Sequence, residues 1–64
     1  MTLGNYIKQR RATLGQSQPE LAEVIGIEQS YLSKLENDKS IPSNDIFRRL
    51  LSALNCSIEE VIAT

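Results

Sequence analysis

Apolar positions recur along this chain at the spacing of an α-helix, in short segments bounded by residues that start or end helices. No segment alternates apolar and polar residues with a period of two over several positions, so no sheet is expected. The pattern predicts an all-α fold with five helices, near residues 3–14, 18–25, 29–37, 44–54 and 58–62.

Capping residues set the predicted helix boundaries. The predicted helix starts follow hydroxyl side chains that can accept a hydrogen bond from the first turn, at Thr2, Ser17, Ser43 and Ser57. Ser17 with Glu20 has the S-x-x-E form of a capping box, and so does Ser57 with Glu60. The predicted stops are residues that tolerate a left-handed backbone, at Gly15, Gly26 and Asn55.

The apolar faces of these helices predict one hydrophobic core. Its expected members are Leu3, Ile7, Leu14, Leu21, Ala22, Ile25, Leu32, Leu35, Ile46, Leu50, Leu51, Leu54, Ile58 and Val61. A chain of this size buries only about 60% of the surface that its unfolded form exposes. We therefore expect one compact domain over residues 1–64, in which Ile58, Val61 and Ile62 either complete the core or partly face a second subunit.

The segment from Ser17 to Asn37 carries the most informative pattern. Two short helices joined by a turn at Gly26 form a helix-turn-helix unit. On the second of these helices, Leu32 and Leu35 face inward, and the residues at i, i+1, i+4 and i+5 share the opposite face. These residues are Gln29, Ser30, Ser33 and Lys34. Such side chains hydrogen-bond base edges and phosphates, although they would also suit an ordinary solvated helix face.

The sequence Q-P-E-L-A-E-V-I-G-I followed by S-Y-L-S-K-L-E-N resembles the helix-turn-helix of the Cro/repressor (XRE-type) transcriptional regulators. The resemblance covers about residues 3–62 and implies a compact five-helix domain of the lambda-repressor-like DNA-binding type. It implies that helix 29–37 lies in the major groove of double-stranded DNA, where Gln29, Ser30, Ser33 and Lys34 read bases. It further implies phosphate contacts by Gln18, Asn37, Lys39, Ser40, Ser43 and Asn44.

A structural ion pair between Arg11 and Glu36 is also expected. Arg11 lies near the edge of an apolar stripe and Glu36 follows the core residue Leu35, where a charge needs a partner or access to water. In the family, a pair at these positions commonly ties the first helix to the end of the recognition helix. The spacing alone also allows both side chains to be solvated.

Two residues depart from the family pattern. Glu28 stands where the family often has a Ser or Thr cap on the reading helix; its carboxylate suits the helix dipole but repels phosphate. It could instead accept from a cytosine amino group. Asp38 replaces the usual glycine after Glu-Asn, which predicts a stiffer or reshaped loop.

Composition narrows the classes of function. The chain has one cysteine, Cys56, and no histidine, which leaves too few ligands for a zinc site and no Ser-His or Cys-His pair. We expect no enzyme activity, catalytic residue, metal, cofactor or small-molecule substrate. No apolar run approaches the length of a membrane span and the N-terminus lacks a signal-peptide pattern, so a cytoplasmic location is the default expectation.

The net charge of −1 is low for a DNA-binding domain and gives little attraction to phosphate per subunit. A homodimer bound to a palindromic operator is therefore expected, and the resemblance implies that it forms through the C-terminal region. The acidic balance and Glu28 also leave a second hypothesis open. The same fold could serve as a protein-interaction module, such as an antitoxin-like subunit or a domain of a larger regulator.

Overall fold

The computed structural model describes residues 2–55, and this part of the chain forms four helices and no strand. The helices are α1 (Leu3–Thr13), α2 (Gln18–Ile25), α3 (Gln29–Glu36) and α4 (Asn44–Ala53). The all-α prediction is confirmed, and each of these four helices begins and ends within one residue of its predicted bounds. Residues 2–55 thus contain four helices in place of the five predicted for the whole chain, and the helix expected near 58–62 lies outside the described residues.

Three of the four helices begin at the predicted hydroxyl caps. The backbone N–H groups of Asn5, Glu20 and Ile46 donate to the hydroxyl oxygens of Thr2, Ser17 and Ser43 at 3.1, 3.3 and 3.3 Å. The Ser17 backbone N–H also donates to the Glu20 carboxylate at 2.9 Å, which completes the capping box. The bond from the Ser17 backbone N–H is the main reason why the pKa of Glu20 lies below its ordinary value. The hydrogen bond with the Ser17 hydroxyl lowers that pKa further.

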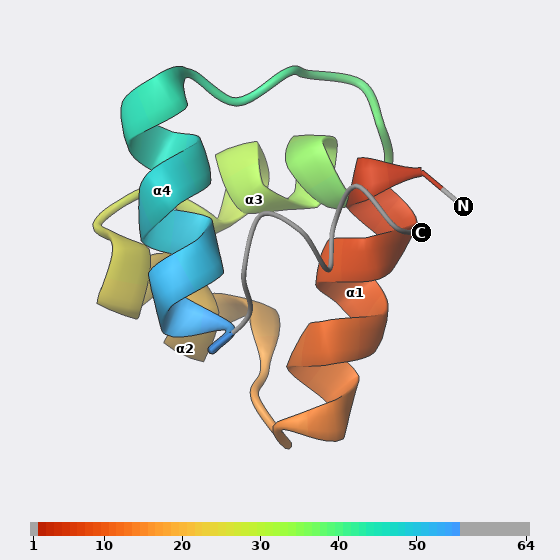
Figure 1. Cartoon of the computed structure of the whole chain (residues 1–64), viewed down its shortest axis with the longest axis vertical. Coiled ribbons are helices and arrows are strands. Elements are labelled where there is room, and N and C mark those ends of the chain that lie inside the picture. The colour runs from red at the N-terminus through yellow and green to blue at the C-terminus, as the bar shows by residue number, and fades with distance from the viewer. Residues whose placement is uncertain (1, 56–64) are drawn as a thin grey trace.

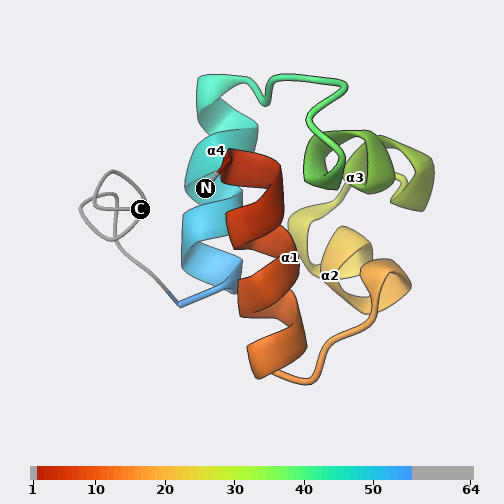
Figure 2. The ribbon, with the colours of Figure 1, turned by 90° about the vertical axis from the view of Figure 1, so that its right-hand side faces the viewer.

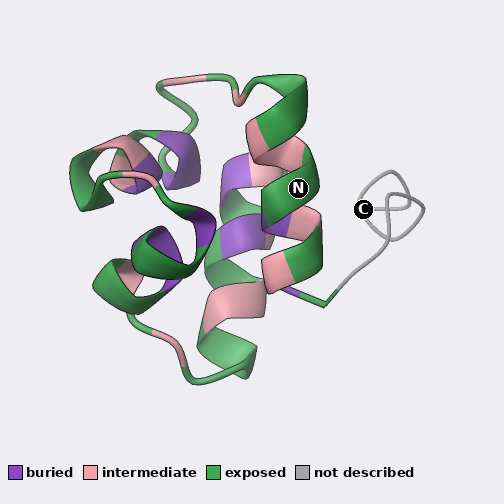
Figure 3. Cartoon of the chain, turned by 90° about the vertical axis from the view of Figure 1, so that its left-hand side faces the viewer, coloured by how far each residue is buried: buried purple, intermediate pink, exposed green. Residues whose placement is uncertain are grey.

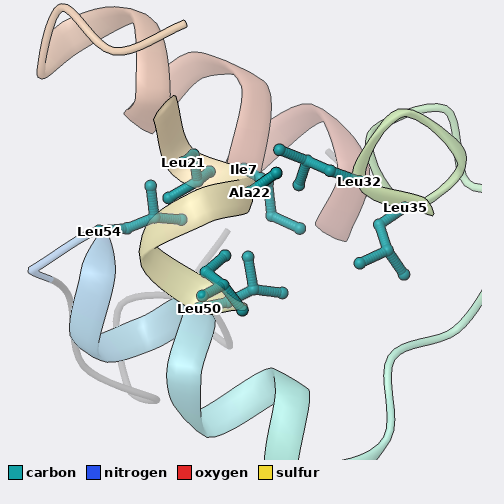
Figure 4. Packing of buried hydrophobic residues seen from close by; sticks show 8 residues of the cluster. Ile7, Leu21, Ala22, Leu32, Leu35, Leu50 and Leu54 are labelled. Atoms are coloured by element: carbon teal, nitrogen blue, oxygen red, sulfur yellow. The ribbon is translucent and has the colours of Figure 1, made fainter. Parts of the chain in front are cut away.

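The helices pack so that α3 contacts both α1 and α2, while α4 packs against α2 (Figures 1 and 2). The buried parts of the ribbon face the interior between the helices, and the outer turns are exposed (Figure 3). The core cluster consists of Ile7, Leu21, Ala22, Ile25, Leu32, Leu35, Leu50 and Leu54 (Figure 4). All eight were predicted from the helical spacing of apolar residues.

Other members of the predicted core lie at its edge or outside it. Leu14 was predicted wrongly, since 40% of its surface is exposed. It follows the last residue of α1, and the chain turns away at Gly15, which has a φ of 71°. Among the remaining predicted members, Leu3, Ile46 and Leu51 are half-buried, and Ile58 and Val61 lie outside the described residues. Three residues that were not predicted pack against the cluster, namely Ile27, Tyr31 and Ala53.

Gly4 marks a very close approach between α1 and the end of α3. A Cβ atom at this position would lie 2.5 Å from the Glu36 carbonyl oxygen, 2.6 Å from that of Leu35 and 2.7 Å from Oδ1 of Asp38. Backbone carbonyls cannot turn aside as a flexible side chain can. A larger residue at position 4 must therefore push α3 away from α1.

We expect Gly4→Ala to lower the free energy of unfolding by about 1–3 kcal/mol because of this overpacking. Urea denaturation followed by circular dichroism measures the change. Asn5→Ala, at the exposed neighbouring position on α1, is the matched control and should stay within about 0.5 kcal/mol of the parent. Equal midpoints for Gly4→Ala and the parent would show that α1 and α3 do not approach this closely in solution.

Candidate nucleic-acid interface

The outward side of α3 presents the four predicted base-reading residues. Gln29, Ser30 and Lys34 are exposed and Ser33 is half-buried, whereas the opposite side buries Leu32, Leu35 and Glu36. Glu28 is the N-cap residue of α3, but its side chain makes no capping hydrogen bond. The N-terminal turn of α3 is therefore polar and lacks a side-chain cap.

The carboxylate of Glu36 is the buried polar centre of the domain. Only 1% of the residue is exposed, and the Arg11 guanidinium forms a forked pair with it. The Arg11 Nε and Nη2 groups donate to Oε2 and Oε1 of Glu36 at 2.7 and 3.2 Å, and Nη1 donates to the Gln16 carbonyl at 2.9 Å. This geometry satisfies a buried charge with its opposite and fastens α1 to the end of α3.

Gln18 links this buried pair to the exposed face of α3. Its Nε2 donates to Oε1 of Glu36 at 2.9 Å, and its own Oε1 accepts from Nε2 of Gln29 at 3.4 Å. The structure thus brings Gln18, which was predicted to bind phosphate, next to Gln29, which was predicted to read a base. Sequence reasoning did not foresee this contact. The available signal was a glutamine in the first turn of each helix of the motif.

The other predicted phosphate ligands lie at the end of α3, in the loop that leads to α4 and at the start of α4 (Figure 1). Lys39 and Asn44 are exposed and Ser40 is half-buried. The Asn37 amide is already engaged, because it donates to the Ser33 carbonyl at 2.9 Å and to the Ser33 hydroxyl at 3.4 Å. The remaining member, Ser43, caps α4.

Asp38 shapes this loop in a way that sequence reasoning did not predict. Its φ of 59° keeps the left-handed conformation that a glycine would adopt at this position. Its carboxylate accepts from the Thr2 hydroxyl at 2.7 Å and from the Gly4 backbone N–H at 3.0 Å. Asp38 thereby binds the N-terminus of α1, where a negative charge is favourable.

Two further arginines bind backbone carbonyls at helix ends. Arg10 donates to the Leu54 and Asn55 carbonyls at 2.9 and 3.1 Å, at the end of α4. Arg49 donates to the Ile25 carbonyl at 3.1 Å, at the end of α2. A cation at this end of a helix satisfies a free carbonyl and complements the helix dipole.

The remaining cations make no such bond to any residue between 2 and 55. The chain has seven lysines and arginines, all within the described residues, and Arg10, Arg11 and Arg49 are used internally. The other four are Lys8, Lys34, Lys39 and Arg48. Lys34 lies on the outward side of α3 and Lys39 in the loop that follows it, so half of the uncommitted positive charge lies beside the candidate interface.

Within residues 2–55, no group of His, Cys, Asp and Glu side chains is arranged to hold a metal ion. None of the four helices in this range is both long enough and apolar enough to span a bilayer.

A family model of the helix-turn-helix matches residues 7–61. This chain belongs to the XRE-type helix-turn-helix family of transcriptional regulators. The match spans the sequence of all four described helices apart from the first residues of α1, so the family assignment does not rest on the two-helix motif alone.

Several known proteins are similar to this chain in sequence. The ImmF control region 10 kDa protein of Bacillus phage phi105 is 32% identical over 56 residues, covering 88% of this chain and 62% of the relative. An uncharacterized HTH-type transcriptional regulator of Mycobacterium tuberculosis is 36% identical over 56 residues, covering 88% of this chain and 40% of the relative. The chain therefore spans less than two thirds of the length of these relatives.

A solved structure shares the fold of this helix-turn-helix domain. SinR, the master regulator for biofilm formation, was crystallised in complex with DNA. The two chains are 34% identical and superpose with a TM-score of 0.86, over 95% of this chain and 98% of the SinR chain in that crystal structure. This agreement supports the lambda-repressor-like arrangement of the helices.

Proposed function

We propose that this chain is a sequence-specific regulator of transcription that binds double-stranded DNA with α3 in the major groove. The observation that carries the proposal is the exposed polar face of α3, held by a helix-turn-helix whose other helix touches it through Gln18 and Gln29. The likeness to a regulator crystallised with DNA supports it. In this arrangement α2 crosses the phosphate backbone while the start of α3 meets base edges.

Base recognition is assigned to the four outward residues of α3. Gln29 lies in the first helical turn, and a glutamine amide can pair with adenine through one donor and one acceptor. Ser30 and Ser33 are short donors and acceptors, and Ser33 also accepts from Asn37. Lys34 can reach a guanine or a phosphate. These contacts would set the sequence preference.

Phosphate binding is assigned to two regions that flank α3. One is Gln18 in the first turn of α2, at the end of the helix where the dipole favours an anion. The other comprises the end of α3, the loop after it and the start of α4, through Asn37, Lys39, Ser40, Ser43 and Asn44. Such contacts fix the register of the protein on DNA without reading sequence.

Dimerisation would compensate for a weak electrostatic attraction. Within residues 2–55, four cations make no internal hydrogen bond or ion pair, and the net charge of the chain is −1, so counterion release by one subunit is small. We propose a homodimer formed through the C-terminal region and bound to a palindromic or near-palindromic site. Its half-site centres would lie about one helical turn apart, roughly 34–36 Å. Linking two reading helices raises affinity through effective concentration.

Selection of bound duplexes from a random DNA pool tests the proposal, followed by titration of the selected site at two salt concentrations. We expect Gln29→Ala to relax the preference at one base pair and to cost about 1–3 kcal/mol of binding free energy. Lys39→Ala should weaken binding to all sequences alike and reduce the salt slope by about 1. The matched control is Lys8→Ala, which removes the same charge from α1 and should change neither quantity.

Folded variants of Gln29 and Lys39 that bind and discriminate as the parent does would show that this face of α3 is not the reading face. A chain that selects no duplex at all would exclude the proposed function. Either result would favour a protein-interaction module of the same fold, which is the alternative that the acidic balance and the exposed Glu28 support.

A further inference from the structure

We propose that the buried carboxylate of Glu36 determines which base Gln29 prefers, by fixing the direction of the Gln29 amide through Gln18. Glu36 is thus a positioning residue for sequence preference in addition to the ion-pair partner of Arg11. The inference rests on the proposed function, because it assigns a direction to the base contact of Gln29. It arises from three hydrogen-bonded side chains that run from the core to the surface of α3.

The first step is the fixed polarity of Glu36. A carboxylate paired with a guanidinium can only accept hydrogen bonds, and Arg11 donates to both of its oxygens. The group on Gln18 that meets Oε1 of Glu36 must therefore be its NH₂ group, as the 2.9 Å contact shows. Gln18 then turns its carbonyl oxygen away from Glu36.

The second step transfers this direction to the surface. The carbonyl oxygen of Gln18 can only accept, so the NH₂ group of Gln29 turns toward it, at 3.4 Å. This second bond is longer than the first, and burial falls along the same path, from the buried Glu36 through the half-buried Gln18 to the exposed Gln29. Gln29 is left with its carbonyl oxygen and one N–H free to meet a ligand.

The third step is the match to a base. Adenine presents the N7 acceptor and the N6 amino donor in the major groove, which complements one N–H and one carbonyl oxygen side by side. Guanine presents two acceptors, N7 and O6, and would face the Gln29 carbonyl oxygen with one of them. The hydrogen-bond direction from Glu36 through Gln18 to Gln29 therefore favours adenine and disfavours guanine.

Reversing the direction of the hydrogen bonds from residue 36 through Gln18 to Gln29 should reverse this base preference. The amide introduced by Glu36→Gln can keep the 2.7 Å bond from Arg11 Nε by placing its oxygen at the Oε2 position. Its NH₂ group then stands at the Oε1 position, where it gives up the 3.2 Å bond from Arg11 Nη2 and can donate to the Gln18 carbonyl. Gln18 would then turn its own NH₂ group toward the Gln29 carbonyl oxygen. The Gln29 NH₂ group would point outward, where it suits the acceptors of guanine.

Binding to duplexes that carry each of the four base pairs at every position of the selected site tests the inference. One base-pair position should lose its preference in Gln29→Ala. At this position the parent should bind adenine about tenfold more tightly than guanine, which is the effect of a good paired contact. Glu36→Gln should lower that ratio about tenfold or invert it. Gln18→Met, which leaves the Arg11–Glu36 pair intact, should bring the ratio close to one. Preferences at the other positions should not follow the ratio. Because Gln18 is also assigned a phosphate contact, Gln18→Met should weaken binding to all duplexes alike as well, and the adenine-to-guanine ratio is the readout of positioning.

Two comparisons separate positioning from a merely structural role. Adding Glu36→Gln to Gln18→Met should leave the adenine-to-guanine ratio unchanged, because the path between the residues is already broken. Gln9→Met is the matched control, because it replaces a glutamine by methionine at an exposed position of α1. It should keep the adenine-to-guanine ratio of the parent. In the free protein, the side-chain NH₂ resonances of Gln29 should shift in Glu36→Gln, but not when Gln18→Met is already present.

The inference is overturned if Gln29→Ala levels the preference at one position while folded Glu36→Gln and Gln18→Met both keep it. The proposed function would stand in that case. The inference would also be overturned if the side-chain NH₂ resonances of Gln29 in the free protein did not shift in Glu36→Gln. This measurement needs no DNA. A chain that selects no DNA sequence would remove the proposed function and this inference together.

Discussion

Arg11→Met is expected to lower the free energy of unfolding by about 3–5 kcal/mol, because it leaves the Glu36 carboxylate buried without a cation. Glu36 is fully enclosed and only 18% of the Arg11 side chain is exposed, so water cannot replace the guanidinium. The substitution also removes the bond to the Gln16 carbonyl. A domain of this size has only about 5–15 kcal/mol of stability, so much of it would be lost.

Urea denaturation of the parent, Arg11→Met, Glu36→Gln and the double variant measures this effect and its origin. The double variant should be more stable than the sum of the single losses predicts, because removing the carboxylate relieves the unpaired charge. Arg48→Met is the matched control, since Arg48 is exposed and makes no hydrogen bond or ion pair with the described residues 2–55, and it should stay within about 0.5 kcal/mol of the parent. Strictly additive losses would mean that Arg11 and Glu36 do not interact in solution.

Leu32→Ala and Leu50→Ala should each lower the free energy of unfolding by about 2–5 kcal/mol, because each leaves a cavity at a fully packed position. Leu32 is 0% exposed on α3 and Leu50 is 1% exposed on α4. Both belong to the same cluster, in which α3 and α4 pack with α1 and α2 (Figure 4). Thermal or urea melts of the two variants give the loss directly.

Leu14→Ala is the matched control for these truncations. It removes the same atoms from the same residue type, but Leu14 is 40% exposed beyond the end of α1. Its loss should therefore be well below that of the two core variants. If Leu14→Ala cost as much as Leu32→Ala, the packing at the end of α1 would differ from that described above, and the core predicted from spacing alone would be the better description.

Local hydrogen bonding explains why the helix boundaries were predictable. The caps at Thr2, Ser17 and Ser43 join atoms three residues apart, so the residue types and their spacing are enough to predict them. Helical periodicity likewise identified the eight buried members of the core cluster. It failed at Leu14, because periodicity does not show where the chain leaves a helix and turns away from the core.

The contacts that organise the candidate interface join residues far apart in the sequence. Gln18 meets Glu36 across 18 positions and Asp38 meets Gly4 across 34, so no local pattern predicts either pair. The outward face of α3 follows from its sequence, since helical geometry separates it from Leu32 and Leu35. The direction of the Gln29 amide does not follow from the sequence of α3. It depends on a carboxylate buried by the packing of α1 against α3, and only the tertiary structure decides which groups that packing brings together.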